Sequence, residues 1–265
     1  MKVTLVLKKL YAVNFTRMSL PRVSLLGVFI DPVTRTEAIE RIRGFLMEER
    51  QRHVMTPNNE MLVETVRNKP FRELLNKADL NIPDSVGLLW MARLTRQKLP
   101  ERVTGVDTVT ALCRTLTEDT PIFLLGAQEG MAEAAAQSLM NENPHLKVAG
   151  CFAGTPREED APTILNMIRA AAPHLLLVAY GAPMQDLWIA RHLNELTSVR
   201  VAIGIGGTFD FLAGKCKRAP AWMRGIGLEW LWRLIREPTR IGRIWRAVVV
   251  FPLLVLRYGK NAPKK

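Results

Sequence analysis

One carboxylate in this sequence lies where α/β proteins commonly place their reacting groups. Asp84 follows a short β-rich run and directly precedes a helical pattern that begins at Ser85. In open parallel sheets, ligands and reacting groups gather at the carboxyl ends of the strands. A carboxylate at such a point can act as a general base. An Asp before a helix can equally cap it by accepting backbone N–H groups, so both roles are open for Asp84.

Two more polar clusters flank predicted elements on either side of Asp84. Thr56 and Asn58 end another β-rich run, and Arg102 lies downstream. If these positions share one edge of a sheet, a carboxylate, a hydroxyl, an amide and a guanidinium converge there. Thr56 and Asn58 can instead cap the helix that begins near Glu60, and Arg102 can be a surface ion-pairing residue. The coincidence of the three clusters favours a polar site.

Two glycine-containing turns can present backbone N–H groups to a phosphate. Gly126 follows one predicted strand, and Gly206 and Gly207 follow another within a Gly-Ile-Gly-Gly-Thr run. N–H groups between a strand and a helix suit an anion. At Gly126 tight packing is an equal alternative, whereas the denser run favours ligand contact. Neither turn has the lysine of a Walker motif or the acidic ribose partner of a dinucleotide site.

The residue types give no support for a metal or an organic cofactor. The four histidines have no ligand spacing, and no Asp-x-Asp pair is present to hold a divalent ion on a diphosphate. The three cysteines are far apart, so neither a disulfide framework nor a zinc site is indicated. We therefore expect no cofactor, metal-independent chemistry and a reducing compartment.

β-rich runs alternate with helical patterns along most of the chain. The runs are Val23–Ile30, Val54–Thr56, Leu80–Pro83, Ile122–Leu125, Val148–Phe152, Leu175–Tyr180 and Val199–Ile203. Helical patterns include Met131–Met140, Ile164–Ala171 and Gln185–Leu196, and Thr34 with Glu37 forms a capping box. This alternation predicts an α/β fold, a Rossmann-like, mostly parallel sheet with helices on both faces.

The composition indicates a globular protein with three segments. The chain has 265 residues, of which 48% are hydrophobic, enough for a sizeable core. We expect a basic leader over residues 1–22 without the apolar core of a signal peptide, a catalytic body over 23–214 and an appendage over 215–265. The longest uncharged apolar run, residues 247–256, is short of the ~20 residues that a spanning helix needs.

The positive charge is concentrated in the appendage. The net charge is +12, and residues 215–265 hold 13 basic and 2 acidic residues. Trp and Leu interleave there with Arg, as in helices that lie in the interface of an anionic membrane. A helical cap with solvent-facing arginines and a nucleic-acid-binding segment are the alternatives. The membrane interpretation is preferred, with the protein on the inner face of the cell membrane.

Several short motifs occur in a fixed order between Leu26 and Arg246. They are Thr56-Pro57-Asn58, Ile82-Pro83-Asp84, Arg102-Val103-Thr104-Gly105, Gly181-Ala182-Pro183-Met184-Gln185, Gly204-Ile205-Gly206-Gly207-Thr208-Phe209-Asp210, Arg218-Ala219-Pro220, and the stretch from Leu228-Glu229-Trp230 to Pro238-Thr239-Arg240. Together they resemble the WecG/TagA/CpsF glycosyltransferase family. Members of that family add a sugar from a nucleotide donor to a polyprenyl-linked acceptor during surface-polymer assembly.

The resemblance implies a role for each candidate residue. Asp84 matches the catalytic base of an inverting, metal-independent transfer from a UDP-sugar to a saccharide on polyprenyl diphosphate. The substrate contacts that the resemblance implies are Thr56, Asn58, Arg102 and Gln185. We add Gly126, Gly206 and Gly207 from the glycine turns, and Asp210 from the motif that follows Gly207. The implied lipid-diphosphate or membrane contacts are Arg233, Arg240 and Arg243.

Some positions depart from the family pattern. Ser85 replaces a glycine, Asn59 replaces a proline, and Met184 and Asp186 replace a Lys and a Glu around Gln185. These changes leave the donor open among N-acetylmannosamine, its uronic acid and glucose-type sugars. A soluble nucleotide-binding oxidoreductase and a nucleic-acid-binding protein are rival functions without a supporting motif. A homo-oligomer is compatible with the sequence, which does not set the oligomeric state.

Overall fold

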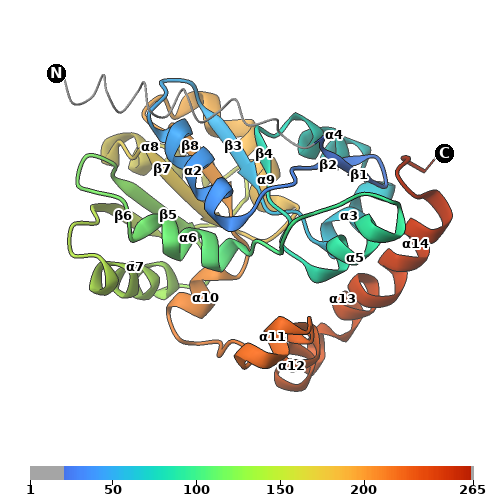
Figure 1. Cartoon of the computed structure of the whole chain (residues 1–265). Coiled ribbons are helices and arrows are strands. Elements are labelled where there is room, and N and C mark those ends of the chain that lie inside the picture. The colour runs from blue at the N-terminus through green and yellow to red at the C-terminus, as the bar shows by residue number, and fades with distance from the viewer. Residues whose placement is uncertain (1–20, 264–265) are drawn as a thin grey trace.

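The computed structural model describes residues 21–263, and its centre is a six-stranded sheet (Figure 1). The strands lie in the order β4-β3-β8-β7-β5-β6, and every neighbouring pair is parallel. Their bounds are Arg52–Met55 (β3), Leu80–Asn81 (β4), Ile122–Gly126 (β5), Val148–Phe152 (β6), Leu175–Ala179 (β7) and Val201–Gly204 (β8). The predicted parallel α/β sheet is confirmed. Most of the predicted leader, residues 1–20, lies outside the described residues.

Helices cover both faces of this sheet. The first layer contains α2 (Arg35–Leu46), α6 (Gly105–Cys113), α7 (Met131–Glu142) and α10 (Thr208–Leu212), and the second contains α8 (Ala161–Ala171) and α9 (Met184–His192). Alternate residues of β5 pack against the two helical layers, because successive side chains of a strand point to opposite faces. Ile122 and Leu124 are buried in the first layer, and Phe123 and Leu125 in the second.

The start of the chain departs from the prediction. Val23–Ile30 was expected to be one strand ahead of the first helix, but it forms two, β1 (Val23–Leu25) and β2 (Val28–Ile30), paired antiparallel outside the main sheet. The chain reverses at Leu26 and Gly27, whose φ angles are 54° and 76°. The prediction was wrong because the β-rich pattern gives little sign of a turn at Leu26 and Gly27. Of these two residues, only glycine adopts a positive φ without strain.

This hairpin belongs to a third apolar core at one side of the sheet. It packs with α3 (Asn59–Arg67), α4 (Lys69–Lys77) and α5 (Val86–Leu94).

Two helix ends can be compared with the prediction. The predicted capping box is present at α2, since Thr34 Oγ1 accepts from the Glu37 N–H at 3.3 Å and the Glu37 carboxylate accepts from the Thr34 N–H at 2.8 Å. Helix α9 ends at His192, and the rest of its predicted span is the 3-10 turn η1 (Leu193–Glu195).

The C-terminal segment is a chain of short helices that leaves the body and returns to it. The elements are α11 (Ala221–Gly225), α12 (Glu229–Arg236), η2 (Pro238–Arg240), α13 (Ile241–Trp245), the π-helical η3 (Arg246–Val250) and α14 (Phe251–Tyr258). Figure 1 shows α11 and α12 below the sheet, with α13 and α14 rising beside α3 and α5.

Helix α14 anchors the end of this segment to the third core. Phe251 and Val255 are fully or almost fully buried there. The N–H groups of Leu26 and Gly27 donate to the carbonyls of Gly259 and Lys260 at 3.0 and 2.9 Å. By contrast, α12 and α13 bury none of their residues. Across residues 21–263, no helix has the length and apolar character that crossing a bilayer requires.

Candidate active site

A cleft of ≈ 1110 Å³ lies at the carboxyl ends of the strands. Its wall on the body comes from the loops after β3, β4, β7 and β8, and its other wall comes from α12, η2 and α13 of the C-terminal segment. The cleft brings together all the predicted site residues except Gly126: Thr56, Asn58, Asp84, Arg102, Gln185, Gly206, Gly207, Asp210, Arg233, Arg240 and Arg243. Strand ends that are far apart in sequence therefore meet, as expected for a parallel sheet.

Asp84 faces this cleft and does not cap α5, the helix that follows it. Helix α5 begins after Ser85, and no side chain caps its first turn. The Asp84 N–H donates to the carbonyl of Pro57 at 3.0 Å, which ties the loop after β4 to the loop after β3. The Asp84 carboxylate accepts from the backbone N–H of Gly105, at the start of α6. The capping alternative is thus wrong, and the side chain is available to a ligand.

The surroundings of Asp84 make it an unusually strong base for a carboxylate. Burial raises its pKa from the ordinary 3.8 to about 7, in spite of Arg102, Arg233 and the Gly105 N–H, which lower the pKa. Glu229 adds to the rise, because a second negative charge disfavours ionisation. A group with a pKa near neutrality combines a large ionised fraction with a useful proton affinity. Asp84 has the properties of a general base.

Thr56 and Asn58, which follow β3, both form hydrogen bonds within the protein. Buried Thr56 donates from Oγ1 to the carbonyl of Gly204 at 3.1 Å and so joins the ends of β3 and β8. Asn58 Oδ1 accepts from the Met61 N–H at 3.1 Å and caps α3, so the capping alternative is confirmed for Asn58. Both residues still line the cleft.

Arg102 pairs with the C-terminal segment. Its guanidinium lies 2.6 Å from a carboxylate oxygen of Glu229, and the two side chains are only 16% and 15% exposed. Glu229 also lies 3.8 Å from Arg218, which in turn pairs with Asp107. An ordinary surface ion pair is therefore the wrong description of Arg102. Sequence reasoning missed Glu229, although an acid in so basic a segment was a usable signal.

Gln185 organises the glycine loops. Its buried amide oxygen accepts from the N–H groups of Gly206 and Gly181 at 2.9 and 3.2 Å. The N–H of Gly206 is thus occupied, while Gly207 lies exposed on the cleft wall. Next to Gln185, fully buried Asp186 lies 3.5 Å from Nε2 of His53.

Gly126 has a packing role. Its φ is 103°, and a Cβ added there would lie 2.9 Å from the Ala179 backbone and 3.0 Å from the Tyr180 ring. Such contacts are too close for any side chain. The residues that line the cleft from this turn are Ala127 and Gln128. The structure favours the packing alternative for Gly126 over contact with a substrate.

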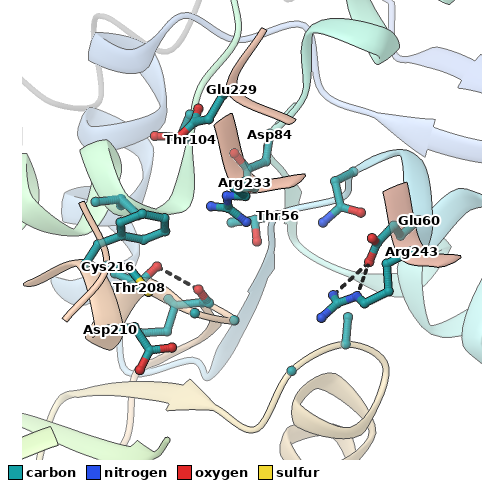
Figure 2. A pocket seen from close by; sticks show the side chains of 18 of the residues that line it. Thr56, Glu60, Asp84, Thr104, Thr208, Asp210, Cys216, Glu229, Arg233 and Arg243 are labelled. Carbon is teal, nitrogen blue, oxygen red and sulfur yellow. Dashed lines mark hydrogen bonds and ion pairs between the residues drawn. The ribbon is translucent and has the colours of Figure 1, made fainter. Parts of the chain in front are cut away.

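The three predicted arginines of the C-terminal segment differ in their surroundings, and Figure 2 shows two of them, Arg233 and Arg243. Arg243 pairs with Glu60 at 2.7 Å, and Arg240 pairs with Glu237. Arg233 lies beside Asp84 in Figure 2, and its guanidinium stacks 4.8 Å from the centre of the Phe211 ring. Within residues 21–263 Arg233 enters no ion pair, so its charge is directed at the cleft.

Two of the departures from the family pattern are in contact with each other. Ser85 Oγ donates to Asn59 Oδ1 at 2.6 Å, and Asn59 Nδ2 donates to the carbonyl of Ala247 at 2.8 Å. Ala247 lies in the π-helical turn η3. A continuous hydrogen-bonded path thus runs from the neighbour of Asp84 to the C-terminal segment. Over the described range 21–263, no three His, Cys, Asp or Glu residues are grouped as metal ligands.

The parallel sheet carries a cationic cleft, and the cleft contains a carboxylate whose pKa is close to neutrality. These features define an α/β enzyme suited to an anionic substrate. Residues 23–265 match the Glycosyl transferase WecG/TagA/CpsF family, and the chain belongs to that family. It is a glycosyltransferase, which overturns the oxidoreductase and nucleic-acid-binding alternatives.

Two relatives of the chain carry the same name. The chain is 32% identical over 212 residues to a Bacillus subtilis (strain 168) protein, covering 78% of this chain and 80% of that protein. It is 28% identical over 251 residues to a Staphylococcus aureus (strain MW2) protein, covering 94% and 97%. Both are named N-acetylglucosaminyldiphosphoundecaprenol N-acetyl-beta-D-mannosaminyltransferase.

Proposed function

We propose that this enzyme transfers N-acetylmannosamine or a related hexose from a UDP-sugar to a saccharide on polyprenyl diphosphate, with inversion and without a metal ion. The names of the relatives support an N-acetylmannosaminyl donor and an N-acetylglucosaminyl-diphosphoundecaprenol acceptor. The observation that carries the proposal is Asp84, whose pKa is raised to about 7, in a cleft that also holds Arg102 and Arg233.

Asp84 is the base in this reaction. Its carboxylate takes the proton of the attacking acceptor hydroxyl while the hydroxyl oxygen bonds to the anomeric carbon of the donor. The bond from that carbon to the diphosphate breaks, and its electron pair leaves with the nucleoside diphosphate. Attack from the face opposite the leaving group inverts the anomeric centre. A positioned base of this kind contributes about 10²–10⁴-fold to the rate.

Arginines stabilise the charge that develops on the leaving group. Arg233 enters no salt bridge among residues 21–263, and Arg102 is held in place by Glu229. Guanidinium groups bind phosphate oxygens through paired N–H donors. Because these donors are already fixed, little reorganisation accompanies the transfer. The exposed backbone of Gly207 adds a further contact on the opposite wall.

The C-terminal segment holds the enzyme at the inner face of the membrane. Ile235, Ile241 and Trp245 are exposed on helices that also carry arginines. Exposed Trp and Ile enter the headgroup boundary, and each nearby basic residue adds about 1 kcal/mol of attraction to anionic lipid. Because Arg233 belongs to the same segment, docking at the membrane and completion of the cleft are coupled.

Product analysis with the full chain tests this function. We incubate the enzyme with N-acetylglucosaminyl diphosphate on a short prenyl chain and with UDP-N-acetylmannosamine, UDP-N-acetylglucosamine or UDP-glucose. Mass spectrometry is expected to detect one added sugar, with an anomeric configuration opposite to that of the donor by NMR and an undiminished rate in EDTA. Retention of configuration, loss of activity in EDTA, or no product from any UDP-hexose would each contradict the corresponding part of the proposal.

A further inference from the structure

A second cleft lies on the other side of Arg102 from the catalytic cleft. Its volume is ≈ 500 Å³, and Arg102 and Val86 line both clefts. The remaining walls come from α5 of the body and α11 of the C-terminal segment. The turn after α11 approaches α5 closely, since a Cβ added at Gly227 would lie 3.1 Å from Val86. Asp84 does not line the second cleft, so a ligand there is separate from the proposed base.

The charge in this cleft is positive and incompletely neutralised. Arg93, Arg102 and Arg224 line it together with one acid, Asp107. Asp107 is already bound by Arg218 and by the Thr104 hydroxyl. Arg102 is likewise occupied by Glu229. Within residues 21–263, neither Arg93 nor Arg224 enters a salt bridge.

One nitrogen in this cleft lacks a partner altogether. Nε of Arg224 is buried and has no hydrogen-bond acceptor among residues 21–263. A buried donor without an acceptor is costly, and a charged one more so. Native structures satisfy such groups with protein, water or a bound ion. A guanidinium with one unsatisfied N–H, in the same cleft as a second guanidinium that enters no salt bridge, is suited to a phosphate group.

Four large apolar side chains are exposed on or next to the two helices that flank the second cleft, and we call them its apolar rim. Trp90 and Leu94 on α5 are 58% and 54% exposed, and Trp222 and Ile226 at α11 are 65% and 56% exposed. Solvent-exposed tryptophans beside basic residues are typical of surfaces that enter the headgroup region of a bilayer. Two of these four side chains belong to the catalytic body, so the surface is not limited to the basic C-terminal segment.

We propose that the second cleft binds the phosphate headgroup of an anionic phospholipid through Arg93 and Arg224, while Trp90, Leu94, Trp222 and Ile226 enter the headgroup boundary. This inference deepens the proposed function, on which it rests, because it names the lipid contact that orients the body at the membrane. The occupant is a phospholipid rather than a nucleotide because the cleft combines cationic walls with an apolar rim. Because Arg102 lines both clefts, it then lies beside both the headgroup and the substrate.

The test compares two double variants of the full chain in vesicle sedimentation. Arg93→Gln/Arg224→Gln removes both unpaired guanidinium groups, and Arg114→Gln/Arg169→Gln removes the same charge from surface pairs with Glu142 and Glu195 on α7 and η1. The vesicles are phosphatidylcholine with or without phosphatidylglycerol. With phosphatidylglycerol present, the first variant is expected to bind about 30-fold more weakly than the wild type, since two basic contacts are lost. Equal binding by the two variants would overturn the proposal.

A second readout does not depend on charge. Tryptophan fluorescence of the wild type is expected to be quenched by brominated lipid, and the conservative variant Trp90→Phe to lose part of that quenching. Unchanged quenching in Trp90→Phe would mean that α5 does not contact the membrane. Thermal unfolding verifies that each variant is folded. Turnover of the short-chain acceptor in detergent is expected to be unchanged in Arg93→Gln/Arg224→Gln. A wild type that binds these vesicles but transfers no sugar would refute the proposed function and leave the lipid site standing.

Discussion

Glu229 of the C-terminal segment holds Arg102 of the body at 2.6 Å, next to the carboxylate of Asp84. The pair is largely shielded from water, so its electrostatic attraction is stronger than that of an exposed pair. Glu229 raises the pKa of Asp84 and Arg102 lowers it. The C-terminal segment therefore acts on Asp84, the proposed base, in two ways, by adding a negative charge and by fixing the position of a positive one.

Replacing Glu229 with Gln is expected to lower the pH at which the enzyme becomes active. Without the negative charge of Glu229, the pKa of Asp84 falls, and the ascending limb of kcat/KM against pH moves toward acid. The lost charge-assisted hydrogen bond also lowers the free energy of unfolding by about 1–3 kcal/mol. Glu237→Gln is the control, since Glu237 pairs with Arg240 within the same segment. An unshifted pH profile in Glu229→Gln would mean that Glu229 does not affect the pKa of Asp84.

Replacing Asp84 with Asn tests the base itself. The amide cannot accept the proton, so kcat is expected to fall about 10²–10⁴-fold while binding of the donor is retained. In the wild type, kcat/KM should rise with pH up to about 7, the pKa of Asp84, because the ionised form is the active one. Steady-state kinetics from pH 5 to 9 and calorimetric titration of the UDP-sugar measure both effects. A variant with the wild-type rate would assign the base to another residue.

The stability of the wild type, unlike its activity, is expected to fall with pH relative to that of Asp84→Asn. Folding raises the pKa of Asp84, so its contribution to stability is complete below the ordinary 3.8 and is lost as the pH rises through about 7. The neutral amide escapes this loss. Relative to the wild type, the variant should gain on the order of 2 kcal/mol between pH 4 and pH 8, since partial exposure screens the charge. Urea unfolding at the two pH values measures the difference, and a pH-independent difference would contradict the raised pKa.

The path from Ser85 through Asn59 to Ala247 predicts coupling between the catalytic loop and the C-terminal segment. Asn59→Ala removes both hydrogen bonds and should cost about 1–2 kcal/mol. Hydrogen exchange of residues 241–258 should accelerate, because η3 loses its hydrogen bond to Asn59. Ser85→Ala should add little in the Asn59→Ala background. Gln137→Ala, which breaks an exposed bond to Asn141, is the control and should leave this exchange unchanged.

Phe251 is expected to stabilise the body as well as the segment that contains it. It is fully buried in the third core, so Phe251→Ala should lower the free energy of unfolding by about 3–5 kcal/mol. Trp245→Ala, a large apolar residue that is 60% exposed, should change it by about 0.5 kcal/mol or less. Chemical denaturation followed by circular dichroism measures both. Similar effects of the two variants would mean that α14 does not belong to the core.

The sequence by itself determined the sheet and the edge at which the site lies. Alternating β-rich and helical patterns are local properties, and they predicted the strands that end before Thr56 and Asp84. Parallel connections then place those ends at one edge, so convergence of the two residues followed from topology alone. The motifs around them also sufficed to indicate the glycosyltransferase family.

Only the tertiary structure decided which partners these residues have. Asp84 and Asn58 both precede helices, yet Asn58 caps and Asp84 faces the cleft. Arg102 meets Glu229, which lies 127 residues further along the chain. Local propensity carries no information about such a contact, because its energy depends on burial and on charges that the whole fold brings together. The raised pKa of Asp84 has the same origin, since desolvation exists only once the chain has folded around it.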